Sequence, residues 1–152
     1  RFVPSKGAQV LIDALDYVQT SVSAVFIGSG RQQSDLDDLK SMLPDRHSFT
    51  FTGWQDEETI QKWYARATAV VVPSLWDEPF GLVGIEAMRA GKPVIGFDRG
   101  GITEWLKNND TGLLTDPNPA SLAEAIELIA KDPAFAEKLG TKGRGSRWFD
   151  NG

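Results

Sequence analysis

Cysteine is absent from the 152 residues, which excludes disulfide frameworks, thiol catalysis and cysteine-bound metal sites. Histidine occurs once, at His47, so the sequence supplies neither a catalytic triad nor a histidine metal site. Because His47 follows Asp45-Arg46 and precedes a predicted strand, we expect it in a surface loop. No apolar run approaches the roughly 18 residues that a membrane span requires.

A basic excess is also missing. The sequence holds 16 lysine and arginine residues against 21 aspartate and glutamate residues, a net charge of -5. A nucleic-acid surface needs an excess of cations over one face, so binding to nucleic acid is not expected. With 41% apolar and 24% charged residues, the chain has the composition of one ordinary globular domain with a substantial core.

The familiar nucleotide-binding signatures are incomplete. There is no G-x-x-x-x-G-K phosphate loop. Gly28-Ser29-Gly30 follows a predicted strand in the manner of a dinucleotide fingerprint, but Gln33 stands at the third glycine position. Hydride chemistry with a dinucleotide is therefore not expected.

Strand and helix signals alternate along the chain, which predicts a mostly parallel sheet with helices on both faces. This is a Rossmann-like, doubly wound α/β arrangement, in which ligands bind beyond the carboxyl ends of the strands. Strands are predicted at 22–28, 48–52, 68–73, 92–97 and 112–115. Helices are predicted at 6–19, 34–43, 57–67, 80–91, 102–107, 120–131 and 133–143.

The segment from Val70 to Met88 carries the clearest site signal. Its apolar start predicts a buried strand, a loop follows Pro73, and a helix is expected after Pro79. The first amides of that helix have no intrahelical partner and face a ligand at the positive end of the helix dipole. We expect these donors, on Phe80, Gly81 and Leu82, to bind an anion such as a diphosphate.

Two carboxylates flank these amides. Glu78 stands at the mouth of the helix, where the alternative to a ligand contact is a carboxylate that is simply favoured by the helix dipole. Glu86 lies about two turns into the helix, where a carboxylate accepts hydrogen bonds from vicinal hydroxyls. Amides that donate to a phosphate, beside a carboxylate that accepts from hydroxyls, suit a sugar nucleotide as the ligand.

The spacing Glu78-x7-Glu86, within EPFGLVGIEAMRAGKPV, resembles the signature of the retaining family-4 glycosyltransferases of the GT-B fold. Four other segments resemble the family in the same order. Arg1-Phe2-Val3-Pro4-Ser5-Lys6-Gly7 is similar to its arginine and lysine pair, and Gly28-Ser29-Gly30 to its second nucleotide loop. Gly100-Gly101-Ile102 and Thr111-Gly112-Leu113-Leu114 are similar to its closing strands and turns. The resemblance covers almost the whole chain.

The resemblance implies a role for each matching residue. Arg1 and Lys6 would neutralise the leaving diphosphate, Glu78 would hold the donor sugar, and Glu86 would bind the ribose. Gly28 and Gly30 would contact the nucleotide. Without the resemblance, Arg1 and Lys6 would be read as solvated surface cations.

The tryptophans and one acidic pair have further interpretations. Trp54 could border the base, and a core or rim aromatic is an equal alternative. Trp63, Trp105 and Trp148 are expected to pack on helices. Asp35-Leu36-Asp37 matches the D-x-D motif of metal-dependent glycosyltransferases of another fold, but its polar neighbours in the sequence indicate a solvated helix start.

The implied activity is transfer of a hexose from a nucleotide diphosphate sugar to an unknown sugar, lipid or protein acceptor, with the anomeric configuration retained. No cofactor is expected, because the sugar nucleotide is a co-substrate. The resemblance also implies that no metal is bound. UDP-sugars are the first choice of donor, but GDP- and ADP-sugars use the same framework. Two alternatives stay open, namely a non-catalytic nucleotide-sugar-binding module and a sugar-nucleotide epimerase of the same fold.

The resemblance also implies that residues 1–152 are a C-terminal donor-binding domain. The expected organisation places the first strand of the domain and an N-terminal acceptor domain outside these residues. A cytoplasmic location is the default expectation, with possible peripheral contact at the inner face of a membrane through the N-terminal domain. Alone, the chain is expected to bind a donor without turnover.

Overall fold

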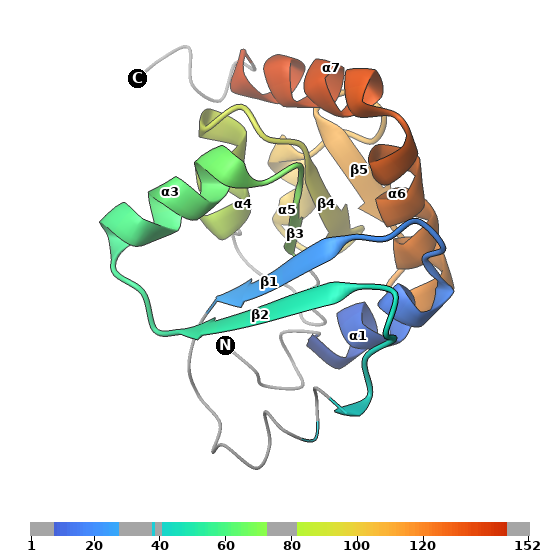
Figure 1. The fold of residues 1–152 in the computed structure, drawn as a ribbon. Coiled ribbons are helices and arrows are strands. Elements are labelled where there is room, and N and C mark those ends of the chain that lie inside the picture. Colours follow the sequence, from blue (N-terminus) through green and yellow to red (C-terminus); the bar gives the residue numbers. More distant parts are fainter. Residues whose placement is uncertain (1–7, 28–37, 39–40, 73–81, 146–152) are drawn as a thin grey trace.

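The computed structural model describes residues 8–27, 38, 41–72 and 82–145 (Figure 1). The strands are β1 (Ser23–Ile27), β2 (Ser48–Gly53), β3 (Val70–Val72), β4 (Val94–Phe97) and β5 (Gly112–Thr115). The helices are α1 (Ala8–Tyr17), α3 (Glu57–Arg66), α4 (Leu82–Arg89), α5 (Ile102–Trp105), α6 (Pro119–Lys131) and α7 (Pro133–Arg144). From β2 to α6 strands and helices alternate, while β2 follows β1 and α7 follows α6 in the order of described elements.

All pairings among these strands are parallel, and they form two hydrogen-bonded sets. One set joins β1 to β2, with Ala24 opposite Phe49. The other set has the order β3-β4-β5, with Val71 opposite Ile95 and Ile95 opposite Leu113. In a doubly wound sheet, the first strand lies between the strands that correspond to β1 and β3. The residues before α1, where the sequence predicts the end of that strand, lie outside the described residues.

The set β3-β4-β5 has a hydrophobic cluster on each face. Successive side chains of a strand point to opposite sides, so neighbouring residues enter different clusters. Val71, Ile95 and Leu113 belong to a core cluster shared with α1, α6 and α7. Val72 and Val94 belong to a second cluster shared with α3, α4 and the α5 region. Helices therefore cover both faces, as Figure 1 shows, and the predicted Rossmann-like α/β class is confirmed.

Local capping explains where three of the helices begin. Asp56, Asn118 and Asp132 are the N-cap residues of α3, α6 and α7, and each side chain accepts a backbone N–H three residues on, at 2.8, 2.8 and 3.0 Å. Proline at the first position of α6 and α7 lacks an amide that would be unsatisfied there in any case. With Asn118 as cap, α6 begins at Pro119, one residue before the predicted start.

The predicted strands agree with β1 to β5 to within two residues at their described ends, and β5 agrees at both ends. The predicted helix 102–107 is too long. α5 ends at Trp105 because Leu106 adopts an extended conformation, with φ -100° and ψ 116°. Most of the predicted helix 34–43 lies outside the described residues.

His47 lies in the turn before β2, as predicted, but the prediction that it is at the surface is wrong, since only 6% of this residue is exposed. Its Nδ1 accepts the amide of Val22 at 3.2 Å, so Nε2 carries the proton and donates to the Leu15 carbonyl at 2.8 Å. Arg46 donates to carbonyls at the end of α1, including Val18 O at 2.8 Å. Arg46 and His47 therefore satisfy carbonyl groups at the carboxyl end of α1, although the two segments are about 30 residues apart in the sequence.

Two of the three tryptophans that were expected to pack on helices lie in the described residues and confirm the expectation. Trp105 is 1% exposed in the core cluster beside α4. Trp63 is half-buried, and the guanidinium of Arg66 lies 4.7 Å from the centre of its ring, a cation–π contact. Trp148 lies outside the described residues.

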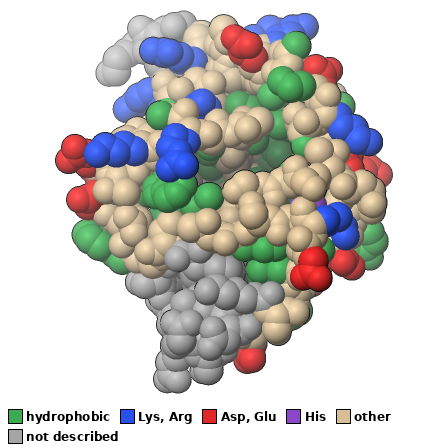
Figure 2. Space-filling view, viewed as in Figure 1, with side chains coloured by type: hydrophobic (Ala, Val, Ile, Leu, Met, Phe, Trp, Pro, Cys, Tyr) green, Lys and Arg blue, Asp and Glu red, His purple; other side chains and the backbone are tan. Residues whose placement is uncertain are grey.

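The described surface carries charges of both signs. On the face seen in Figure 2, lysine and arginine side chains spread over the upper half, with acidic side chains among them. None of the helices within the described ranges has the length and apolar character needed to cross a membrane.

Candidate functional site

The strand-to-helix unit that carries the clearest sequence signal is β3 followed by α4. β3 ends at Val72, and α4 begins at Leu82. The connection between them, residues 73–81, contains Glu78, Phe80 and Gly81 and lies outside the described residues. Arg1, Lys6, Gly28 and Gly30 also lie outside them. The roles assigned to these seven residues therefore stay predictions.

Glu86 is a member of the predicted site whose side-chain contact the structure describes. It stands in the second turn of α4, half-buried, and its Oε2 accepts a hydrogen bond from the hydroxyl of Tyr64 on α3 at 3.5 Å. Burial raises the pKa of Tyr64 to about 12, with the negative charge of Glu86 and its hydrogen bond as further causes. The phenol therefore stays protonated as a donor at neutral pH. Sequence reasoning did not identify Tyr64, because nothing in its local pattern distinguishes it from an ordinary core aromatic.

α4 is held close to its neighbours by glycine. A Cβ at Gly84 would lie 2.1 Å from Cη2 of Trp105, so only glycine allows the indole to lie against this part of the helix. Ala87 and Met88, on the same helix, are fully buried. Beyond the end of α4, Lys92 donates from Nζ to the Ala65 carbonyl of α3 at 3.0 Å. These contacts fix α4, and with it Glu86, against α3 and α5.

Trp54 follows the carboxyl end of β2 and is 74% exposed. Gly53, before it, has a φ of 72°, a left-handed conformation that favours glycine and turns the chain at the end of the strand. The core interpretation of Trp54 is therefore excluded. A place at the rim and a place beside a bound base both remain compatible with its position, so its contact with a ligand stays a prediction.

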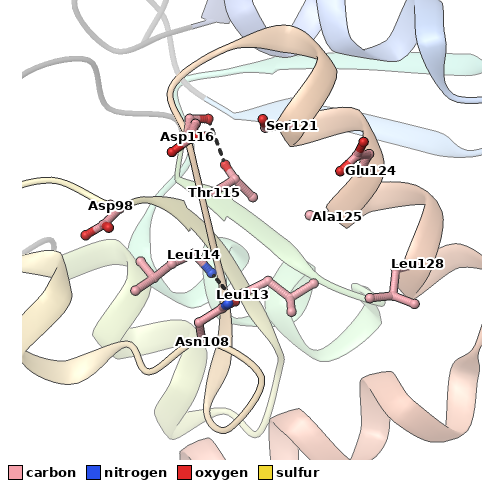
Figure 3. A pocket seen from close by; sticks show the side chains of 10 residues that line it. All are labelled: Asp98, Asn108, Leu113, Leu114, Thr115, Asp116, Ser121, Glu124, Ala125 and Leu128. Atoms are coloured by element: carbon pink, nitrogen blue, oxygen red, sulfur yellow. Dashed lines mark hydrogen bonds between the residues drawn. The ribbon is translucent and has the colours of Figure 1, made fainter.

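The sequence did not predict the cavity in Figure 3, which has a volume of about 330 Å³. It lies between β5 and α6, on a different part of the sheet from α4. Oδ1 of Asn108 accepts a hydrogen bond from the backbone amide of Leu114 in β5, at 3.0 Å. Asp98 and Asp116, which directly follow β4 and β5, give it an acidic rim. Its lining residues are Asp98, Asn108, Leu113, Leu114, Thr115, Asp116, Ser121, Glu124, Ala125 and Leu128.

Glu86 does not line this cavity, so the cavity does not mark the predicted site. The acidic rim also does not amount to a metal site, because the described part of the chain contains no group of three or more Asp, Glu or His residues that could hold a metal ion. The expectation of chemistry without a metal stays a prediction.

Residues 1–146 match the family described as Glycosyl transferases group 1. The chain belongs to this family. The expectation of a GT-B glycosyltransferase domain is thereby confirmed, since the match spans nearly the whole chain and solved glycosyltransferases share its fold.

Similar proteins support the same assignment. The uncharacterized glycosyltransferase MJ1607 of Methanocaldococcus jannaschii is 36% identical over 142 residues, which cover 91% of this chain and 36% of that protein. The structure of Anabaena Alr3699/HepE in complex with UDP and glucose superposes with a TM-score of 0.85 at 29% identity, covering 95% of this chain and 41% of that one. Sucrose-phosphate synthase from Thermosynechococcus elongatus gives a TM-score of 0.83 at 39% identity, covering 95% of this chain and 38% of that one.

The chain thus spans between 36% and 41% of the length of these relatives. The shared region is the glycosyl transferases group 1 domain. What the complete protein transfers, and to which acceptor, is a matter for proposal.

Proposed function

We propose that this glycosyl transferases group 1 domain binds the nucleotide diphosphate sugar of a retaining glycosyltransferase, which transfers a hexose to an acceptor held by another part of the protein. The observation that carries the proposal is the family match over residues 1–146. The likeness to a solved glycosyltransferase in complex with UDP and glucose supports UDP as the first nucleotide to test.

In the proposed mechanism, the diphosphate leaves the sugar on the face that the acceptor attacks. Arg1 and Lys6 neutralise its growing charge, and the amides of Phe80, Gly81 and Leu82 donate to its oxygens. Glu78 binds hydroxyls of the donor sugar. Because these donors and cations supply the electrostatic stabilisation, no metal ion is required in this scheme.

Glu86 is proposed to bind the vicinal hydroxyls of the ribose. A carboxylate is purely an acceptor, and its two oxygens match the spacing of two neighbouring hydroxyls. The half-buried position of Glu86 on α4 supports the proposal, because a partly desolvated carboxylate gives stronger hydrogen bonds than one in bulk water. The exposed Trp54 is proposed to border the base.

The first prediction concerns nucleotide binding. UDP should bind with a similar Kd in the presence of magnesium or of a chelator, because cations and amides of the chain bind the diphosphate. Replacing Glu86 with Ala should weaken UDP binding by roughly tenfold or more, through loss of charged hydrogen bonds to the ribose. Isothermal titration calorimetry with UDP, GDP and ADP measures both effects.

A matched control is Glu104→Ala, because Glu104 is an exposed glutamate on α5. It should leave the Kd for UDP unchanged. Strict dependence on a divalent metal would contradict the metal-free scheme. Equal loss of affinity in the two variants would show that the effect of Glu86→Ala is not specific to a contact with the ribose.

A further inference from the structure

Tyr64 combines a buried ring with a polar group that needs a partner. The residue is 5% exposed and belongs to the core cluster that also contains Val72, Met88 and Trp105. A buried phenol hydroxyl without an acceptor is unfavourable, so the hydroxyl of a buried tyrosine usually has a hydrogen-bond partner. Glu86 Oε2 is the side-chain acceptor that the structure provides, at 3.5 Å.

The contact constrains Glu86 more than it constrains Tyr64. The ring of Tyr64 is fixed by core packing and has few rotatable bonds, whereas a glutamate side chain has three. A hydroxyl presented from α3 therefore selects among the rotamers of Glu86 on α4. Because the bond is made to Oε2, the second oxygen and the remaining lone pairs of the carboxylate stay available to other donors.

We propose that Tyr64 is a positioning residue, whose hydroxyl holds Oε2 of Glu86 so that the carboxylate is preorganised for a vicinal diol of the ligand. The inference rests on the proposed function, in which that diol belongs to the ribose of the donor. Tyr64 itself touches no reacting atom. It reduces the conformational freedom that Glu86 loses when the ligand binds.

A purely structural role makes a different prediction. If Tyr64 only fills the core, Tyr64→Phe keeps the ring, removes one poorly placed hydroxyl, and has the same effect on every ligand. If Tyr64 positions Glu86, its removal affects ligands with a vicinal diol and spares ligands without one. The two roles are therefore separated by the ratio of two dissociation constants in each protein.

The test compares UDP with 2′,3′-dideoxy-UDP, by calorimetry on the protein and its variants. The unmodified protein should bind UDP roughly tenfold more tightly than the dideoxy compound. Tyr64→Phe should weaken UDP binding by about two- to tenfold and leave the dideoxy compound unaffected. In a Glu86→Ala background, Tyr64→Phe should have no further effect on either ligand, because the coupled partner is gone.

Tyr17→Phe is the matched control, since the sequence contains two tyrosines and Tyr17 is 61% exposed on α1. This variant should keep the ratio of the unmodified protein. It also leaves Tyr64 as the single tyrosine, so a ¹³Cζ label on tyrosine reports on its hydroxyl alone. Glu86→Gln should shift that resonance at neutral pH even without ligand, because an amide replaces the charged acceptor.

The outcomes separate the two levels of the argument. No binding of UDP, GDP or ADP to the unmodified protein would overturn the proposed function and, with it, the positioning role. Tighter binding of UDP than of dideoxy-UDP, with an unchanged ratio in Tyr64→Phe, would overturn the positioning role alone. An unmoved Tyr64 resonance in Glu86→Gln would do the same, since it would show that the hydroxyl and the carboxylate are not coupled.

Discussion

Glu127 on α6 accepts hydrogen bonds from the backbone amides of Gln19 and Thr20, which stand 108 and 107 residues earlier. The distances to Oε1 are 2.9 and 3.3 Å. These amides belong to the turn between α1 and β1, so one carboxylate secures the path of the chain into the sheet. A hydrogen bond from the side chain of Thr20 is the main cause that lowers the pKa of Glu127, and the two backbone amides lower it further.

This residue gives a prediction about pH. A carboxyl whose pKa is lowered on folding stabilises the fold above its ordinary value of 4.5, and the contribution is lost as pH falls through the lowered value. Glu127→Gln should therefore lower the free energy of unfolding at pH 7, by less than about 1 kcal/mol because the group is exposed. The deficit should shrink progressively below pH 4.5. Urea unfolding at several pH values measures it.

Glu124→Gln is the matched control, because Glu124 is an exposed glutamate on the same helix. It should leave stability unchanged across the same pH range. A deficit for Glu127→Gln that grows on acidification would contradict the linkage.

Single residues also show what a sequence can and cannot reveal. Glu86 was placed correctly on its helix because the apolar spacing of α4 and its distance from Pro79 are local information. His47 was misplaced because its partners, Val22 and Leu15, become neighbours only when β1 pairs with β2. Tyr64 was missed for the same reason, since its contact joins two helices.

At the scale of elements, the position of α4 depends on close approach at its small residues. Gly84 faces the indole of Trp105, and Gly140 of α7 packs against Gly91 just beyond the end of α4. A Cβ at Gly140 would lie 2.2 Å from the Gly91 carbonyl oxygen. Both glycines therefore set the distance between α4 and its neighbours, which decides where Glu86 lies.

Gly84→Ala tests this arrangement. The added methyl would lie 2.1 Å from Trp105 Cη2, so α4 or the indole must move. We expect a loss of about 1–3 kcal/mol in the free energy of unfolding, as is typical when a packed core receives extra volume. Urea denaturation measures the loss, and UDP calorimetry should show weaker binding because Glu86 moves with α4.

The control is Gly145→Ala, at an exposed position where the nearest atom would lie 3.6 Å from the new Cβ. It should change stability little. A Gly84→Ala protein as stable as the unmodified one would show that α4 adjusts freely, and would weaken the view that Gly84 positions the site.

The elements themselves were largely predictable, because their signals are local. The N-caps Asp56, Asn118 and Asp132 and the prolines at 119 and 133 are local signals of helix starts, and the predicted starts of α3, α6 and α7 agree with the structure to within one residue. The early end of α5 was not predictable, because the apolar Leu106 continues the helical pattern. Tertiary packing in the core beside α4 favours its extended conformation instead.

At the scale of the whole molecule, the chain corresponds to only part of the length of its relatives. The chain matches 36% of the M. jannaschii protein and 41% of the Anabaena structure. Doubly wound domains bind ligands outside the carboxyl ends of their strands, so such a domain forms one wall of a site. We propose that the acceptor is positioned by a part of the protein beyond residues 1–152.

This proposal predicts that residues 1–152 alone bind UDP but transfer no sugar. A donor bound to one wall leaves its anomeric carbon in contact with water, and no acceptor is held in place. Positioning two reactants supplies roughly 7–11 kcal/mol of a barrier, so its loss should abolish measurable turnover. Mass spectrometry of UDP-glucose incubated with the chain and a panel of sugar, lipid and protein acceptors would detect any product.

Calorimetry on the same preparation serves as the control, because bound UDP shows that the absence of product does not come from an unfolded or empty domain. The complete protein should form product with one member of the panel under identical conditions. Steady transfer by residues 1–152 alone, within about tenfold of a typical turnover near 10 per second, would overturn the proposal. It would mean that the groups on this domain both hold the donor and position the acceptor.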